Sequence, residues 1–108
     1  MSDVFQQNRA RFDALYSDPT YAIKLRAKGL LTFTRQEGRW LTKRIARLTG
    51  FTIPPQASVL EIGAGNGYVS TNLALAHPTI QVMVLDLSAE AVKASRRHGV
   101  VEGIQANA

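Results

Sequence analysis

Three glycines at alternate positions are the residues of this chain whose type and spacing most constrain its chemistry. Gly63, Gly65 and Gly67 follow the apolar run 59–62, which carries one carboxylate, Glu61. The run predicts a strand buried on both faces. Glycines directly after such a strand let the backbone turn sharply and approach a ligand. A helical pattern follows at once, so its first N–H groups would point into the same crevice, as in a nucleotide site.

A second carboxylate stands where this site requires one. The apolar run 80–86 ends in Asp86, about one helix and one turn after the glycines. In a right-handed β-α-β unit, Asp86 then lies at the carboxyl end of the strand beside the glycine loop. A carboxylate there can accept two hydrogen bonds from ribose hydroxyls. Nicotinamide enzymes use an acidic residue in the same way, so Asp86 alone leaves two cofactors open.

The glycine spacing favours one of these cofactors. The dinucleotide fingerprint has glycines at the first, third and sixth loop positions, and the sixth position here is Tyr68. The pattern E-x-G-x-G-x-G, from Glu61 to Gly67, instead resembles motif I of the class I S-adenosylmethionine-dependent methyltransferases. Two alternatives stay open: an NAD(P)-dependent oxidoreductase, and a non-catalytic remnant or binding module of a methyltransferase fold.

The resemblance implies a fold and a set of cofactor contacts. The fold is α/β and Rossmann-like, with strands one to three of a parallel sheet preceded by N-terminal helices. Glu61 would hold the methionine amino group, Asp86 the ribose, and Leu87 the adenine face. The tetrad 105–108 resembles a Gln-Gly-Asp-Ala-like tetrad of the family, so Asn107 would accept a bond from the adenine amino group. The implied cofactor-binding residues are Glu61, Gly63, Ala64, Gly65, Gly67, Asp86, Leu87 and Asn107.

The implied reaction is direct displacement at the methyl group of the sulfonium cofactor. The enzyme then mainly aligns a nucleophile with the C–S bond, which is catalysis by proximity and orientation. No residue can be assigned as a catalytic base. His77 and His98 each stand at a predicted helix end, and nothing resembles a metal site. A small-molecule acceptor is the first expectation, and RNA is the second.

The resemblance covers residues 57–108. The family's sheet has the order 3-2-1-4-5-7-6, and this chain supplies strands one, two and most of three. We therefore expect a fragment of a longer methyltransferase, whose first strand has an unpaired edge and only partly covered faces. A complete chain of this kind would need to be a stand-alone domain or an oligomer.

Residues 1–56 are predicted to form a helical lid or cap segment and a linker. Helical patterns cover 4–16 and 20–28, and a third helix begins at a capping box, in which Thr34 and Glu37 satisfy each other's backbone donors. Gly50 ends that helix, and two prolines mark the linker that follows. The aromatic residues expected in a lid are Tyr16, Tyr21 and Trp40.

Composition is that of one globular domain. The chain has 108 residues, 45% of them hydrophobic, no cysteine and a net charge of +5. We find neither a signal-peptide pattern nor an apolar run long enough to span a membrane, so a cytoplasmic protein is expected. The basic excess lies in residues 1–57. On the third helix, basic residues repeat every four positions: Arg35, Arg39, Lys43 and Arg47. Our first interpretation is a solvated helix face, and our second is a binding site for a phosphate-bearing partner.

Overall fold

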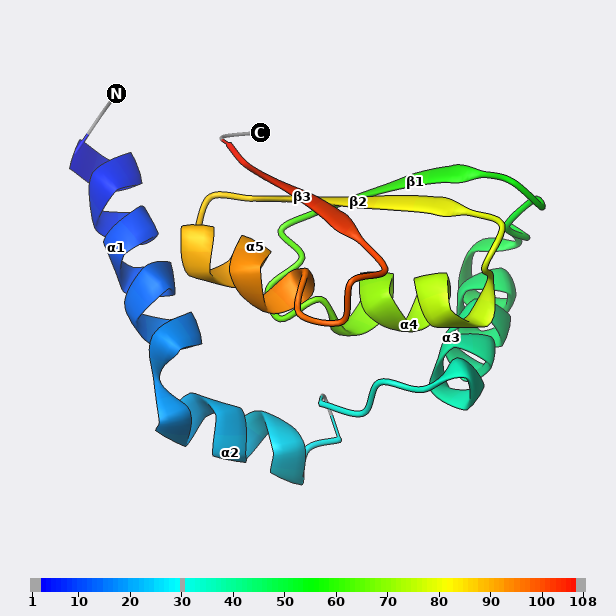
Figure 1. The fold of residues 1–108 in the computed structure, drawn as a ribbon, viewed down its shortest axis with the longest axis horizontal. Coiled ribbons are helices and arrows are strands. Elements are labelled where there is room, and N and C mark those ends of the chain that lie inside the picture. The colour runs from blue at the N-terminus through cyan, green and yellow to red at the C-terminus, as the bar shows by residue number, and fades with distance from the viewer. Residues whose placement is uncertain (1–2, 30, 107–108) are drawn as a thin grey trace.

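The protein is a three-stranded parallel sheet with helices on one face and at both ends (Figure 1). Its structure is a computed structural model that describes residues 3–29 and 31–106. The elements, in chain order, are α1 (Asp3–Ser17), α2 (Pro19–Ala27), α3 (Arg35–Thr49), β1 (Ser58–Ile62), α4 (Tyr68–Ala76), β2 (Gln81–Asp86), α5 (Ala89–Ser95) and β3 (Glu102–Gln105). No helix in the described part of the chain is both long and apolar enough to cross a membrane.

The strand order β1-β2-β3 confirms the predicted β-α-β arrangement. β1 pairs with β2 in parallel from Ser58 to Ile62, and β2 pairs with β3 in parallel. The register sets Asp86 opposite Gln105 at the carboxyl ends of their strands. Within the described residues the outer edge of β1 has no partner strand, as expected from the family order 3-2-1.

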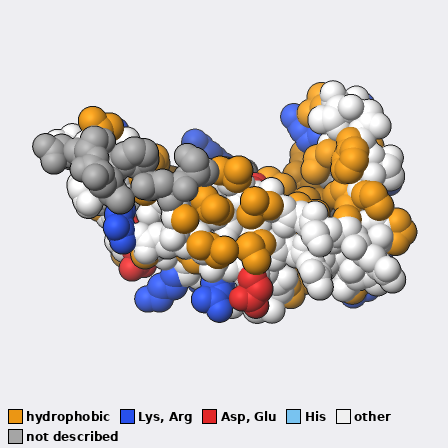
Figure 2. All heavy atoms as spheres, turned by 90° about the horizontal axis from the view of Figure 1, so that it is seen from above, with side chains coloured by type: hydrophobic (Ala, Val, Ile, Leu, Met, Phe, Trp, Pro, Cys, Tyr) orange, Lys and Arg blue, Asp and Glu red, His pale blue; other side chains and the backbone are white. Residues whose placement is uncertain are grey.

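One face of the sheet is covered and the other is open. Val82 and Val84 of β2 are buried against α4 and α5. On the opposite face Leu60 is 53% exposed and Ile62 is 62% exposed, and Figure 2 shows hydrophobic side chains gathered there. The first strand is therefore not buried on both faces, and its faces are only partly covered, as expected for the first strand of a partial sheet. Successive side chains of a strand point to opposite faces, and the helices cover only one of them.

α3 packs closely on α4, which fixes the helical front half to the sheet domain. A Cβ at Gly38 would lie only 1.9 Å from the backbone oxygen of Asn72, so a glycine is required at this crossing. The fully buried Asn72 side chain also accepts a bond from Thr34 N and donates one to Thr32 O. This amide ties the segment before α3 to α4.

The predicted capping box is only half formed. Thr34 Oγ1 accepts a hydrogen bond from Glu37 N at 3.0 Å, as expected for an N-cap. The Glu37 carboxylate does not return the bond; it accepts one from the hydroxyl of Tyr68. Because Thr34 N already donates to Asn72, the reciprocal bond is not needed. Hydrogen bonds to Asn72 and Tyr68 of α4 thus replace the local hydrogen bond that would complete the capping box.

The helix between β2 and β3 is short. α5 stops at Ser95, and Arg97 N donates to Ala94 O in a tighter turn. Gly99, with φ of 70°, then lets the chain turn toward β3. α1, α2 and α3 lie within two residues of their predicted bounds, with Gly50 in the left-handed conformation at the end of α3.

Candidate cofactor-binding site

The glycine loop between β1 and α4 lies at the carboxyl ends of the strands. Gly63, Gly65 and Gly67 all have positive φ, at 72°, 62° and 79°. Gly63 N donates to Leu85 O at 2.8 Å, which holds the loop against the end of β2. A Cβ at Gly63 would meet nothing within 4 Å. This side of the loop is open to a ligand, in keeping with the crevice expected at such a point in an α/β sheet.

Asp86 lies beside the loop, as its position in the sequence predicts. Its Oδ2 accepts a hydrogen bond from Gly65 N at 3.1 Å, and its Oδ1 accepts one from Ser88 N at 2.9 Å. Only 8% of the residue is exposed. A carboxylate offers about four acceptor positions, so about two remain after these bonds. The carboxylate is thus held by backbone donors and retains acceptor capacity for hydroxyl groups.

Glu61 brings a second carboxylate to the same end of the sheet. It points to the face opposite that of its neighbours Leu60 and Ile62, and its Oε1 accepts a bond from Ser70 Oγ at 2.5 Å. Burial raises the pKa of Glu61; the Ser70 hydrogen bonds counteract this in part, and the charge of Asp86 adds to it. A cation bound beside Glu61 would offset the cost of keeping this carboxylate charged.

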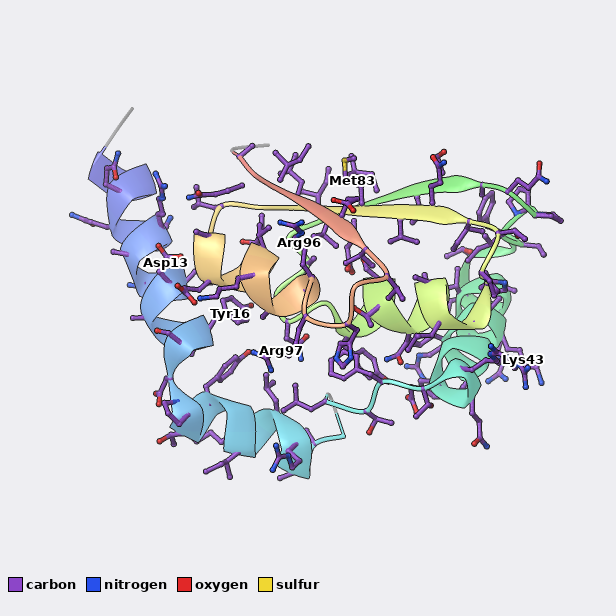
Figure 3. The ribbon with its side chains drawn as sticks, viewed as in Figure 1. Asp13, Tyr16, Lys43, Met83, Arg96 and Arg97 are labelled. Carbon is purple, nitrogen blue, oxygen red and sulfur yellow. The ribbon has the colours of Figure 1, made fainter. Side chains whose placement is uncertain are left out.

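Tyr16 of α1 covers the loop from outside. A Cβ at Gly65 would lie 2.7 Å from the Tyr16 hydroxyl, so the phenol rests on the glycine backbone. Tyr21 of α2 packs edge-on against the Tyr16 ring, with the ring centroids 5.6 Å apart. Burial, followed by the nearby Tyr21 and Asp86, raises the pKa of Tyr16 to about 12, so the phenol is neutral near pH 7. Figure 3 shows Tyr16 between α1 and α5.

Asp13 of α1 is a contact that the sequence did not predict. Its Oδ1 accepts a hydrogen bond from Ser88 Oγ at 2.6 Å and one from Glu90 N at 3.3 Å (Figure 3). These bonds tie α1 to the start of α5, and Ser88 N connects them to Asp86. The partners lie more than seventy positions apart, so no local pattern could reveal them.

The remaining predicted residues are placed less directly. Leu87 is half-buried after Asp86, and its carbonyl accepts a bond from Gln105 Nε2 at 3.2 Å. Ala64 packs against the hydrophobic core. Asn107 lies outside the described residues. The structure does not bring Trp40 to the loop; it is 51% exposed on α3 beside Arg44.

Both histidines have structural partners near helix ends. His77, the residue that follows α4, shares a hydrogen bond of 2.8 Å between its Nε2 and Thr42 Oγ1. The His98 ring packs on Phe33, with centroids 4.4 Å apart. Neither contact belongs to the glycine loop.

The fold and the loop together define the class of protein. The parallel sheet, the glycine loop after β1 and the carboxylate at the end of β2 form a Rossmann-like methyltransferase fold. The family model described as "Methyltransferase small domain" matches residues 45–108, and the chain belongs to that family. No curated protein matches the chain in sequence.

Solved structures of methyltransferases share this fold. The plantazolicin methyltransferase BpumL, bound to a pentazolic desmethylPZN analog and SAH, is 23% identical with a TM-score of 0.52, over 97% of this chain. The sugar N-methyltransferase KedS8 from Streptoalloteichus sp ATCC 53650 is 22% identical with a TM-score of 0.50, over 81% of this chain. Coclaurine N-methyltransferase, bound to N-methylheliamine and SAH, is 18% identical with a TM-score of 0.50, over 65% of this chain. This chain spans 41%, 32% and 22% of their respective lengths.

Proposed function

We propose that this chain binds S-adenosylmethionine at the glycine loop and serves an enzyme that transfers the cofactor's methyl group to an organic acceptor. The observation that carries the proposal is the Asp86 carboxylate, fixed by Gly65 N and Ser88 N with acceptor capacity left over. Membership of the methyltransferase family sets the NAD(P) alternative aside.

The residues of the loop region fit the parts of this cofactor. Glu61 would pair with the methionine ammonium group, whose charge would offset the burial that raises the pKa of this carboxylate. Asp86 would accept bonds from the ribose hydroxyls, and Leu87 would lie against the adenine. The open side of Gly63 would admit the methionyl and sugar portion. We keep Asn107 as a proposed adenine contact.

The bound cofactor supplies an electrophilic methyl group; the described residues position it. Tyr16 would cover the loop, and the hydrogen bonds of Asp13 would hold α1 in that position. Excluding water from this corner strengthens the polar contacts to the cofactor. We assign α1 and α2 to a lid, in keeping with the predicted division of the chain into 1–56 and 57–108. We assign no catalytic base.

The class of methyl acceptor is the second part of the proposal. A small molecule stays first, supported by the similar folds of enzymes named for plantazolicin, coclaurine and sugars. RNA stays second, supported by the basic front half. The sequence of this chain offers no residue that selects between them.

Isothermal titration of the chain with S-adenosylhomocysteine tests the cofactor. We expect saturable binding, with NADH giving none. Asp86→Ala removes two ribose contacts to a charged acceptor, each worth about 1.5–3 kcal/mol, and should weaken binding more than a hundredfold. Asp18→Asn is a matched control, since Asp18 caps α2 through Thr20 N and asparagine caps equally well. A folded wild-type chain that binds NADH but not S-adenosylhomocysteine would refute the proposal.

A further inference from the structure

The outer face of α3 carries a dense set of cations. Arg39, Lys43 and Arg47 stand four residues apart, so they form one ridge along the helix with a rise of about 6 Å between neighbours. All three are exposed, and Figure 3 shows Lys43 pointing away from the body of the protein. Arg44 and Trp40 lie next to this ridge on the same exposed side.

These cations have no acidic partners. Across residues 3–29 and 31–106, the structure has a single ion pair, between Arg96 and Glu102. The one acidic residue of α3, Glu37, is half-buried and accepts its bond from Tyr68 on the inner side. The five cations of α3 are Arg35, Arg39, Lys43, Arg44 and Arg47. Such a concentration of one sign of charge raises the local concentration of an anionic partner.

Trp40 adds a flat aromatic surface among the charges. It is the sole tryptophan of the chain and is 51% exposed. The Arg44 guanidinium lies 5.3 Å from the ring centroid, in cation–π geometry. A large aromatic ring left exposed between basic side chains is what a nucleobase needs for stacking, with phosphates held on either side.

The packing of the inner side of α3 argues against a membrane surface as the partner of this helix. An amphipathic membrane helix turns its apolar face outward into the lipid. Here Leu41 belongs to the hydrophobic core, Ile45 packs against that core, and Gly38 lies against α4. Of the large apolar side chains of α3 besides Trp40, Leu48 alone stays open, at 71% exposed, and the outer side offers cations with one aromatic ring.

We propose that the outer face of α3 binds single-stranded nucleic acid, with phosphates on Arg39, Lys43 and Arg47 and a base stacked on Trp40. The face belongs to α3 and not to the glycine loop, so this inference does not depend on cofactor binding. If it holds, RNA becomes the first acceptor class to test for methyl transfer.

Fluorescence anisotropy with a labelled single-stranded RNA of about 20 nucleotides tests the inference, measured over a series of salt concentrations. The triple variant Arg39→Glu, Lys43→Glu and Arg47→Glu removes three phosphate contacts. We expect the slope of log K against log salt to fall in magnitude by about 2, because each contact to a single strand contributes about 0.7. Circular dichroism should be unchanged, since all three side chains are exposed.

A matched variant separates a local site from general attraction. Lys24, Arg26 and Lys28 of the α2 region are also exposed, and their reversal to Glu changes the net charge equally. This control should keep the wild-type slope. Equal losses in the two triple variants would overturn the proposal, because binding would then follow net charge alone.

Trp40 supplies an independent readout. Its fluorescence should be quenched on RNA binding, and Trp40→Ala should weaken binding about tenfold while leaving the salt slope unchanged. Vesicles containing anionic lipid serve as the competing partner. A blue shift of Trp40 emission with vesicles, and no response to RNA, would overturn the proposal in favour of a membrane surface.

Discussion

Adding one methyl group at Gly67 tests how the glycine loop is held. The Cβ of an alanine there would lie 2.7 Å from Ser95 Cα and 2.9 Å from Ser95 Cβ. Real Cβ atoms essentially never approach other atoms so closely, so the loop and α5 must move apart. Gly63 offers a matched control, because its φ is also positive, at 72°, but its Cβ would meet nothing within 4 Å.

The magnitudes follow from these two environments. A side chain in the left-handed region costs about 1–2 kcal/mol, and the stiffer unfolded chain offsets about 0.4–1 kcal/mol of this. Gly63→Ala should therefore lower the free energy of unfolding by about 1 kcal/mol. Gly67→Ala adds the cost of overpacking, about 1–3 kcal/mol. Its total loss should be about 2–4 kcal/mol.

Urea unfolding followed by circular dichroism measures both losses, and titration with S-adenosylhomocysteine measures the site. The two variants should differ in how their losses divide between the two assays. Gly67→Ala is the less stable, whereas Gly63→Ala, whose methyl points to the open side of the loop, loses more cofactor affinity per unit of stability lost. Equal destabilisation, within about 0.5 kcal/mol, would refute the tight contact between Gly67 and Ser95.

Three further substitutions probe the surroundings of the loop. Burial raises the pKa of Glu61, so the charged carboxylate lowers the stability of the fold as pH rises through the folded-state pKa. Glu61→Gln should therefore unfold at a higher temperature than wild type at pH 7. This difference in unfolding temperature should vanish well below 4.5, the ordinary pKa of glutamate. Asp13→Ala removes the bond from Ser88 Oγ, so backbone hydrogen exchange in α1 should accelerate at least about tenfold. Gly38→Ala places a Cβ 1.9 Å from Asn72 O and should lower the melting temperature by more than about 10 °C.

Each of these has an outcome that would contradict it. For Glu61, a variant that unfolds at the wild-type temperature at pH 7 would mean that the carboxylate is not destabilised by burial. For Asp13, the control is Asp18→Asn, and equal exchange in α1 for both variants would remove Asp13 as the tie to α5. For Gly38, Gly50→Ala is the control: its Cβ would meet nothing within 4 Å, so its loss of about 1 kcal/mol comes from its φ of 73° alone. A loss for Gly38→Ala no larger than this would show that the α3–α4 crossing is not tight.

The sequence predicted the elements whose signals are local. The glycine spacing, Glu61 and Asp86 were sufficient to place the loop, the strand order and the carboxylate that bonds Gly65 N. Caps of α3 followed from Thr34 and Gly50. These features depend on neighbours within one turn of chain or one β-α-β unit, where backbone geometry leaves few alternatives.

The sequence could not predict contacts made across the fold. Asp13 reads as one more charged residue of a surface helix, yet it bonds Ser88 at the far end of the chain. Glu37 fits a capping box, but its carboxylate bonds Tyr68. Trp40 was expected in a lid and lies on the outer side of α3. A polar side chain can form hydrogen bonds with several geometrically acceptable partners, and only the packed structure determines which of these partners lies within reach.

In the proposed cofactor site, the position of Tyr16 predicts that cofactor entry depends on movement of α1. Asp86 is 8% exposed, and the Tyr16 hydroxyl rests on Gly65, whose N–H already bonds that carboxylate. In the proposed binding mode, a ribose would reach Asp86 only if the phenol gives way or α1 lifts from α5. Because Asp13 holds α1 down through Ser88, loosening that bond should speed cofactor entry. It should also speed release, since the same lid then closes less firmly over the bound cofactor. The fold-change in affinity is then the ratio of the two fold-changes in rate, and stopped-flow measurement of Asp13→Ala would separate them.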